Sequence, residues 1–163
     1  MTAINRTEQL PCPSLKAARR RIQRSANSVP LRLEIAATYY STGNYTAART
    51  HLEKVLSLEP GNFHAIYMDG LIFLRKGEFT SAEFRLRNAL DLKPKSEREL
   101  INLYVNLGLA LERSGDQLAA RGQPGQASAK FREAARFYNY ALRLDADNVV
   151  ARTNRERINN KSL

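Results

Sequence analysis

The chain has 163 residues, is 43% hydrophobic and carries a formal net charge of +10, which fits one globular domain with a single core. No apolar run reaches the roughly 20 residues that span a bilayer, and no apolar stretch of a signal peptide opens the sequence. A single cysteine excludes an internal disulfide. We therefore expect a cytoplasmic location (or a stromal or membrane-peripheral one) rather than a secreted or transmembrane protein.

Residues 1–28 are predicted to form a basic segment, in which Glu8 is the single acidic residue. Its cationic centre consists of Arg19, Arg20, Arg21 and Arg24. Residues 14–27 have the pattern of a helix with a narrow apolar stripe. This helix could pack onto the rest of the chain, could lie on an acidic partner, RNA or an anionic membrane, or could be a solvated tail.

An internal repeat follows the basic segment. The stretch HLEKVLSLEPGN at 51–62 returns as RLRNALDLKPKS at 85–96. The first unit contains two helical patterns, at about 30–42 and 46–58, separated by a glycine turn. Gly43 and Gly77 can take the left-handed conformation that ends a helix. A fixed period of 34 residues predicts stacked helical hairpins, because one hairpin cannot bury its apolar face alone.

Small and aromatic residues recur at fixed places in both units, where small side chains let two helices approach and aromatic rings fill the space beside them. These positions resemble the tetratricopeptide repeat in Ala36, Tyr39, Ala48, Pro60, Gly70, Phe73, Ala82 and Pro94. Arg32 departs from the Trp or Leu of the family, and Ile66 occupies that place in the second unit. The resemblance implies an all-α fold of three hairpins in a right-handed solenoid. Its units would be 29–62, 63–96 and 97–147.

The third unit is longer than the other two, and its insertion is equal to two heptads. One extra heptad in each helix would rotate its face by only about 20°. This division predicts helices at 98–121 and 124–145 with the turn at Gly122. The competing interpretation keeps the turn at Gly115 and makes 116–128 a loop.

Residues 114–151, SGDQLAARGQPGQASAKFREAARFYNYALRLDADNVVA, are similar to the enlarged last repeat of the photosystem I assembly proteins of chloroplasts and cyanobacteria. The similarity covers about a quarter of the chain. It implies an assembly or chaperone role in building a multisubunit membrane complex.

The last predicted element is a capping helix at about 148–160, within a C-terminal segment 148–163. We expect its apolar side chains to cover the open end of the repeats and its arginines to point outward. The apolar side chains are Val149, Val150 and Ile158, and the arginines are Arg152, Arg155 and Arg157.

The first helices of such repeats line a concave surface, and here the central positions are mostly apolar. An exposed apolar patch usually marks an interaction site. Predicted partner-binding residues are Leu33, Ala37, Tyr40, His64, Tyr67, Leu71, Leu74, Asn102, Val105 and Leu109. Glu112 and Arg113 continue this face in the third unit. Relatives that grip a terminal carboxylate use Lys, Arg and Asn, but here only Asn102 and Asn106 are suitable. We therefore expect an apolar helix or an extended segment as the partner.

The sequence shows no constellation for catalysis or metal binding, so we expect neither an enzyme nor a cofactor. His51 and His64 lie on different helices and the chain has one cysteine, which gives no metal-ligand set. No phosphate-binding glycine loop follows a strand. Asp69 occupies a place where small residues are usual, and we expect it to be semi-buried against Arg85 or Arg87.

Three kinds of function therefore stay open. The first is a protein-binding adaptor or assembly chaperone that uses the concave apolar groove. The second is an RNA-, ribosome- or anionic-surface-binding protein that uses its basic termini, whose binding would fall steeply with salt. The third is a permanent structural subunit of a larger complex.

Overall fold

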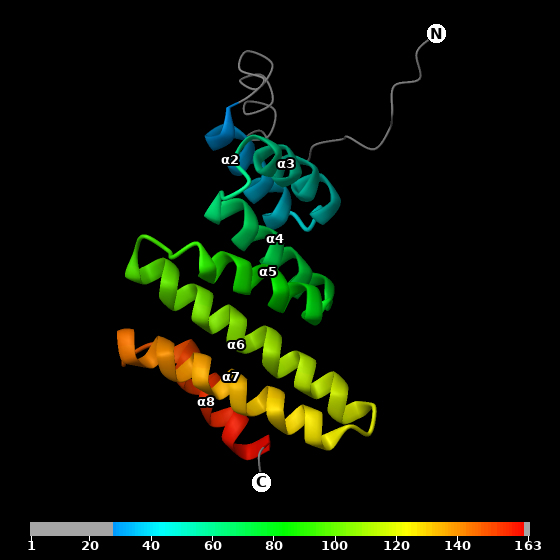
Figure 1. The fold of residues 1–163 in the computed structure, drawn as a ribbon, viewed down its shortest axis with the longest axis vertical. Coiled ribbons are helices and arrows are strands. Elements are labelled where there is room, and N and C mark those ends of the chain that lie inside the picture. The colour runs from blue at the N-terminus through cyan, green and yellow to red at the C-terminus, as the bar shows by residue number, and fades with distance from the viewer. Residues whose placement is uncertain (1–27, 162–163) are drawn as a thin grey trace. The chain divides into compact units, whose positions relative to one another are not determined.

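The computed structural model describes residues 28–161, and all regular secondary structure in this part of the chain is α-helical (Figure 1). Its helices are α2 (Val29–Ser41), α3 (Tyr45–Leu58), α4 (Phe63–Lys76), α5 (Phe79–Asp91), α6 (Glu97–Ala120), α7 (Pro124–Leu144) and α8 (Val149–Lys161). They fall into two compact units, one ending at Asn62 and the other beginning at Phe63. None of these helices is long and apolar enough to cross a bilayer.

The first unit contains the hairpin of α2 and α3. Pro30 lies in the first turn of α2, where its missing N–H costs no hydrogen bond. Gly43 adopts a φ of 77° in the turn, and the side chain of Asn44 accepts a hydrogen bond from the Ala47 N–H at 3.2 Å. Ala36 and Ala48 have no exposed surface, which lets the two helices pack closely.

The hairpin of α4 and α5 opens the second unit and repeats this plan. Gly77 adopts a φ of 75° in its turn. A Cβ atom on Gly70 would lie 2.8 Å from Leu86 Cδ2, so only glycine allows this approach. Asp69 is buried and lies 2.9 Å from Arg85 Nε, which confirms the first of its two predicted partners.

The hairpin of α6 and α7 has the longest helices in the described part of the chain, with 24 and 21 residues against 13 or 14 elsewhere. Ser96 begins α6 with a capping box, in which Ser96 and Glu99 each bond the other's backbone N–H. Of the two possible turns, the structure has the one at Gly122, with a φ of 73°. Figure 1 shows the two helices running antiparallel, side by side.

Two glycines on α6 bring α7 close. A Cβ atom on Gly108 would lie 2.6 Å from Tyr138 Cε1, and one on Gly115 would lie 2.6 Å from Phe131 Cε1. Gly115 is therefore a packing residue inside α6. The heptad interval between the two glycines keeps both on nearly the same side of the helix, so the added length extends the hairpin interface.

The capping helix α8 packs against α7, but with a different face from the one predicted. Its buried residues are Ala151, Asn154 and Ile158, which share one side because they are three and four residues apart. Val149 and Val150 are 70% and 57% exposed. The prediction that these valines cover the end of the repeats was therefore wrong.

Arg157 was also expected to point outward, and it instead turns toward α6, where it pairs with Glu112. The reason is electrostatic, since a buried carboxylate requires a cationic partner. Ile158 is buried as predicted. The basic segment around Arg19, Arg20, Arg21 and Arg24 lies outside the described residues, as does the expected helix at 14–27.

Candidate functional site

The predicted partner-binding residues of the first unit lie on α2. Ala37 is exposed, whereas Leu33 and Tyr40 are half-buried. The ring of Tyr40 lies 5.9 Å from that of Tyr45 on α3, with the planes inclined at 49°. These three side chains therefore retain accessible surface along one side of α2.

The other seven predicted residues lie in the second unit, on α4 and α6. Five of them are apolar or aromatic, and every one of these is half-buried. We call these five the first-helix surface: Tyr67, Leu71, Leu74, Val105 and Leu109. These five side chains therefore retain part of their apolar surface for contact with a partner.

Two contacts set the alignment of α4 and α6. Asn106 Nδ2 donates to Tyr67 Oη at 2.8 Å, and Gln117 Nε2 donates to the Gly77 carbonyl at 3.5 Å. Gln117 lies further along α6 than Asn106 does, and Gly77 directly follows the end of α4, so the two helices run in the same direction. Leu71 and Leu109 lie between these contacts and hence along the same stretch of the surface.

Polar and aromatic groups border the first-helix surface near the start of α4. The ring of Phe63 stacks on that of Tyr67, with centroids 5.7 Å apart and planes within 5°. His64 and Asn102 are exposed, and His64 Nε2 lies 3.7 Å from Glu99 Oε1. The two predicted polar site residues thus flank the apolar ones.

Glu112 does not belong to this surface, although the repeat alignment placed it there. Its side chain has no exposed area and lies among α6, α7 and α8. Arg157 donates to it through Nε at 2.6 Å and Nη2 at 2.8 Å, and Lys161 Nζ donates to Oε1 at 2.9 Å. Tyr138 Oη donates to Oε2 at 3.0 Å.

Burial alone would raise the pKa of Glu112, but the hydrogen bonds from Arg157, Lys161 and Tyr138 outweigh it and lower the pKa to about 2. Burial and the adjacent carboxylate raise the pKa of Tyr138, so its hydroxyl remains a donor. The carboxylate therefore stays ionised and fully bonded, which suits a structural tie better than acid–base chemistry.

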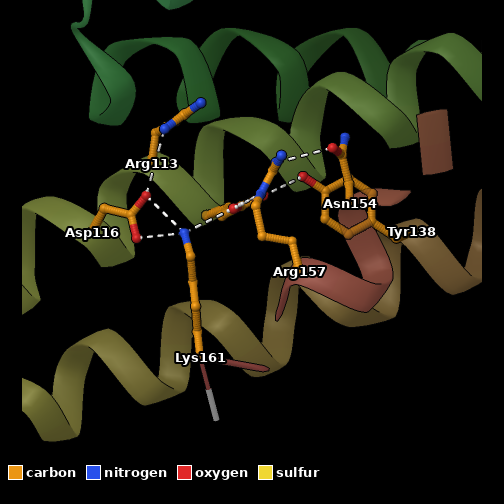
Figure 2. Close-up of polar contacts among 7 residues, drawn as sticks. Arg113, Asp116, Tyr138, Asn154, Arg157 and Lys161 are labelled. Carbon is orange, nitrogen blue, oxygen red and sulfur yellow. Dashed lines mark hydrogen bonds and ion pairs between the residues drawn. The ribbon is translucent and has the colours of Figure 1, made fainter. Parts of the chain in front are cut away.

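Figure 2 shows the further members of this cluster, among them Asp116, Arg113 and Asn154. Lys161 Nζ bonds both oxygens of Asp116 at 2.7 and 3.0 Å. Arg113 lies 3.7 Å from the same carboxylate, and Asn154 accepts from Arg157 at 2.9 Å. The sequence prediction missed this network. One feature of the sequence could have indicated the network. Glu112 lies four residues after Gly108 and three before Gly115, and therefore on the close-packed side of α6.

No group of three or more His, Cys, Asp or Glu side chains within residues 28–161 could hold a metal ion. His51 stacks on Tyr39 with ring centroids 5.7 Å apart, whereas His64 lies on α4 of the other unit. The two histidines therefore have separate surroundings.

Residues 29–62 match the family model of the tetratricopeptide repeat. The chain is 32% identical over 117 residues to the photosystem I assembly protein Ycf3 of Cyanophora paradoxa, across 70% of this chain and 65% of that protein. It is 31% identical over 88 residues to the tetratricopeptide repeat and J domain-containing co-chaperone DNJ1 of Cryptococcus neoformans var. grubii, across 54% of this chain and 17% of that protein. The chain thus spans less than two thirds of the length of either relative.

Among solved structures, the chain resembles YrrB, described as a tetratricopeptide repeat protein with an unusual peptide-binding site. The TM-score is 0.67 at 17% identity, over 88% of this chain and 65% of that one. At this identity the likeness shows the fold alone. The repeat model at residues 29–62, the similarity to Ycf3 and the helical architecture confirm the predicted tetratricopeptide repeat fold.

Proposed function

We propose that this protein is a non-enzymatic adaptor or assembly chaperone that binds an apolar helix or extended segment of another protein. The first-helix surface of α4 and α6 would bind this segment. The client would be a subunit of a multisubunit membrane complex, and the similarity to Ycf3 favours a photosynthetic one.

The observation that carries this proposal is the partial exposure of large apolar side chains along α4 and α6. A solvated helix face would be polar, whereas aromatic and large aliphatic side chains provide most of the energy in protein interfaces. Tyr67 is held in place by Phe63 and by the hydrogen bond from Asn106. A fixed side chain loses less conformational entropy when a partner binds.

The experiment uses the full chain, tagged and expressed in a cyanobacterium, with recovery of photosystem I subunits measured by quantitative mass spectrometry. We expect the wild-type chain to enrich these subunits over a tag-only sample. The double variant Leu71→Ala, Leu109→Ala should lose this enrichment by about tenfold or more, since truncating interface anchors commonly costs about 1 to 2 kcal/mol each.

The matched control is Val149→Ala, Val150→Ala, which truncates two exposed apolar side chains on α8. It should recover the subunits as the wild-type chain does, and circular dichroism should show all three chains folded. Recovery should change little between about 50 and 300 mM salt, because the contact is apolar. Equal recovery by both double variants would refute the role of the first-helix surface.

A further inference from the structure

The outer side of α7 carries three exposed arginines in one line. Positions four and seven residues apart lie on the same side of a helix, and here Arg132, Arg136 and Arg143 have this spacing. Four other residues on that side are also exposed, and none of these is acidic: Gly125, Ala129, Asn139 and Tyr140. Glu133 borders this side and is half-buried.

A fourth arginine reaches this line from α8. Arg155 Nε donates to Asn139 Oδ1 at 3.1 Å, which anchors its guanidinium between the levels of Arg136 and Arg143. We call these four residues the arginine face: Arg132, Arg136, Arg143 and Arg155. Arg132 to Arg143 spans about 16 Å along the helix, at about 1.5 Å per residue.

No carboxylate of the described chain pairs with the arginine face. Arg132 bonds the Ser128 hydroxyl at 2.9 Å, the Arg143 guanidinium lies 5.7 Å from the centroid of the Tyr140 ring, and Arg155 bonds amides. The cation on the adjacent side of α7 behaves differently, since Lys130 pairs with Glu83 of α5. Arg87 of α5 likewise pairs with Glu83 and with Glu133 of α7.

The carboxylates of α7 and of the loop that follows it already have partners. Glu133 accepts from Arg87 at 2.6 Å. Asp145 accepts from the Asp147 N–H and from Asn148, and Asp147 lies 3.4 Å from Arg152. The positive charge of the face is therefore not neutralised within residues 28–161.

We propose that the arginine face binds single-stranded nucleic acid through its phosphates. Guanidinium groups bind phosphate oxygens bidentately. Tyr140, which is 40% exposed, lies between Arg136 and Arg143 and offers an aromatic side chain on which a base could stack. The three arginines of α7 follow the axis of one helix, with Arg155 of α8 beside them, and this linear arrangement matches a linear polyanion.

Two other partners fit this face less well. A protein interface normally has an apolar core, and the face has only Ala129 and the edge of Tyr140. An anionic membrane is usually held by inserted apolar side chains together with charge, and no large aliphatic side chain lies between the arginines. This inference is independent of the proposed function, because it uses α7 and α8 rather than the first-helix surface.

The test measures fluorescence anisotropy of a labelled 20-nucleotide oligouridylate with the full chain at about 50 to 200 mM salt. Each phosphate contact contributes about 0.7 to the slope of log K against log salt for single strands. The variant Arg132→Gln, Arg136→Gln should therefore reduce the slope by about 1.4 and weaken binding at every salt concentration. The control Arg98→Gln, Arg121→Gln removes the same charge from exposed sites on and just after α6 and should keep the wild-type slope.

Three results would overturn the proposal. The first is absence of oligouridylate binding by the wild-type chain, and the second is an equal change of slope in both double variants. The third is binding of vesicles of 3:1 phosphatidylcholine and phosphatidylserine that depends on Arg132 and Arg136 while oligouridylate binding does not. Circular dichroism and thermal midpoints confirm that both variants fold.

Discussion

Arg157 of α8 and Glu112 of α6 lie 45 residues apart in sequence, and they form a bidentate pair at 2.6 and 2.8 Å. The carboxylate has no exposed surface. An ionised carboxylate in such a place is tolerated only when its oxygens are bonded and its charge is balanced. The position of α8 against the long hairpin therefore depends on this contact.

Replacing Arg157→Leu should destabilise the protein by about 2 to 3 kcal/mol, which is the typical contribution of hydrogen bonds to a charged group. Lys161 and Tyr138 would still donate hydrogen bonds to Glu112, so the variant should be less stable but should remain folded. Urea denaturation followed by circular dichroism measures the change. Arg155→Leu on the same helix is the control, because Arg155 bonds amides, and it should change stability by less than about 0.5 kcal/mol. Equal effects would contradict the role of Glu112.

The stability of the protein should depend on pH through Glu112. Its folded-state pKa is about 2, below the ordinary value of 4.5, so the folded state favours the ionised form. This contribution is complete above about pH 5 and is lost as the pH falls toward 2, by about 3 kcal/mol in total. The free energy of unfolding should therefore fall more steeply between pH 5 and 2 in the wild-type chain than in Glu112→Gln. Parallel curves for the two chains would show that Glu112 does not contribute.

Gly108→Ala should destabilise the protein by about 1 to 3 kcal/mol through overpacking. The new Cβ atom would lie 2.6 Å from Tyr138 Cε1, and Tyr138 is fully buried and bonded to Glu112, so it cannot move away freely. Alanine otherwise favours a helix by up to about 1 kcal/mol over glycine. Gly125→Ala on α7 meets nothing within 4 Å and should leave the urea midpoint unchanged or raise it. A raised midpoint for Gly108→Ala would refute close packing there.

Gly122→Ala should cost about 1 to 2 kcal/mol, because residue 122 has a φ of 73° and residues with a Cβ atom are strained in the left-handed region. The neighbouring change Gln123→Ala is the control. Gln123 has a φ of −112° and makes no side-chain capping hydrogen bond, so replacing its side chain should hardly change the stability of the protein. Thermal unfolding by calorimetry distinguishes the two. If Gly122→Ala left the thermal midpoint unchanged, the result would contradict a turn with positive φ at residue 122.

The helices could be predicted because local chemistry determines them. Gly43, Gly77 and Gly122 each mark a turn with positive φ, and small residues such as Ala36 and Ala82 recur where helices touch. The fixed period presents this information twice, so the fold class followed from the sequence. The length of the third hairpin followed from counting residues, since two added heptads preserve the apolar face of each helix.

The surroundings of Glu112 could not be predicted in the same way. The repeat alignment assigns each position by its equivalents in other units, and α8 has no equivalent in them. The angle at which α8 crosses the hairpin decides which of its side chains are buried, and no periodicity in the sequence specifies this angle. Val149 and Val150 were misplaced for that reason, because hydrophobicity alone predicted the burial of Ile158 but did not reveal that Ala151, rather than the valines, would face the hairpin.

The long hairpin also bears on the order in which the second unit folds. Its two helices are joined by a short turn at Gly122, so their contacts close small loops and form rapidly. The ties between α8 and Glu112 must instead close loops of 45 to 49 residues, which costs more chain entropy. In native-state hydrogen exchange, the amides of α8 should therefore exchange through an opening of lower free energy than those at the centre of α6. The C-terminal helix would then unfold locally while the long hairpin stays folded.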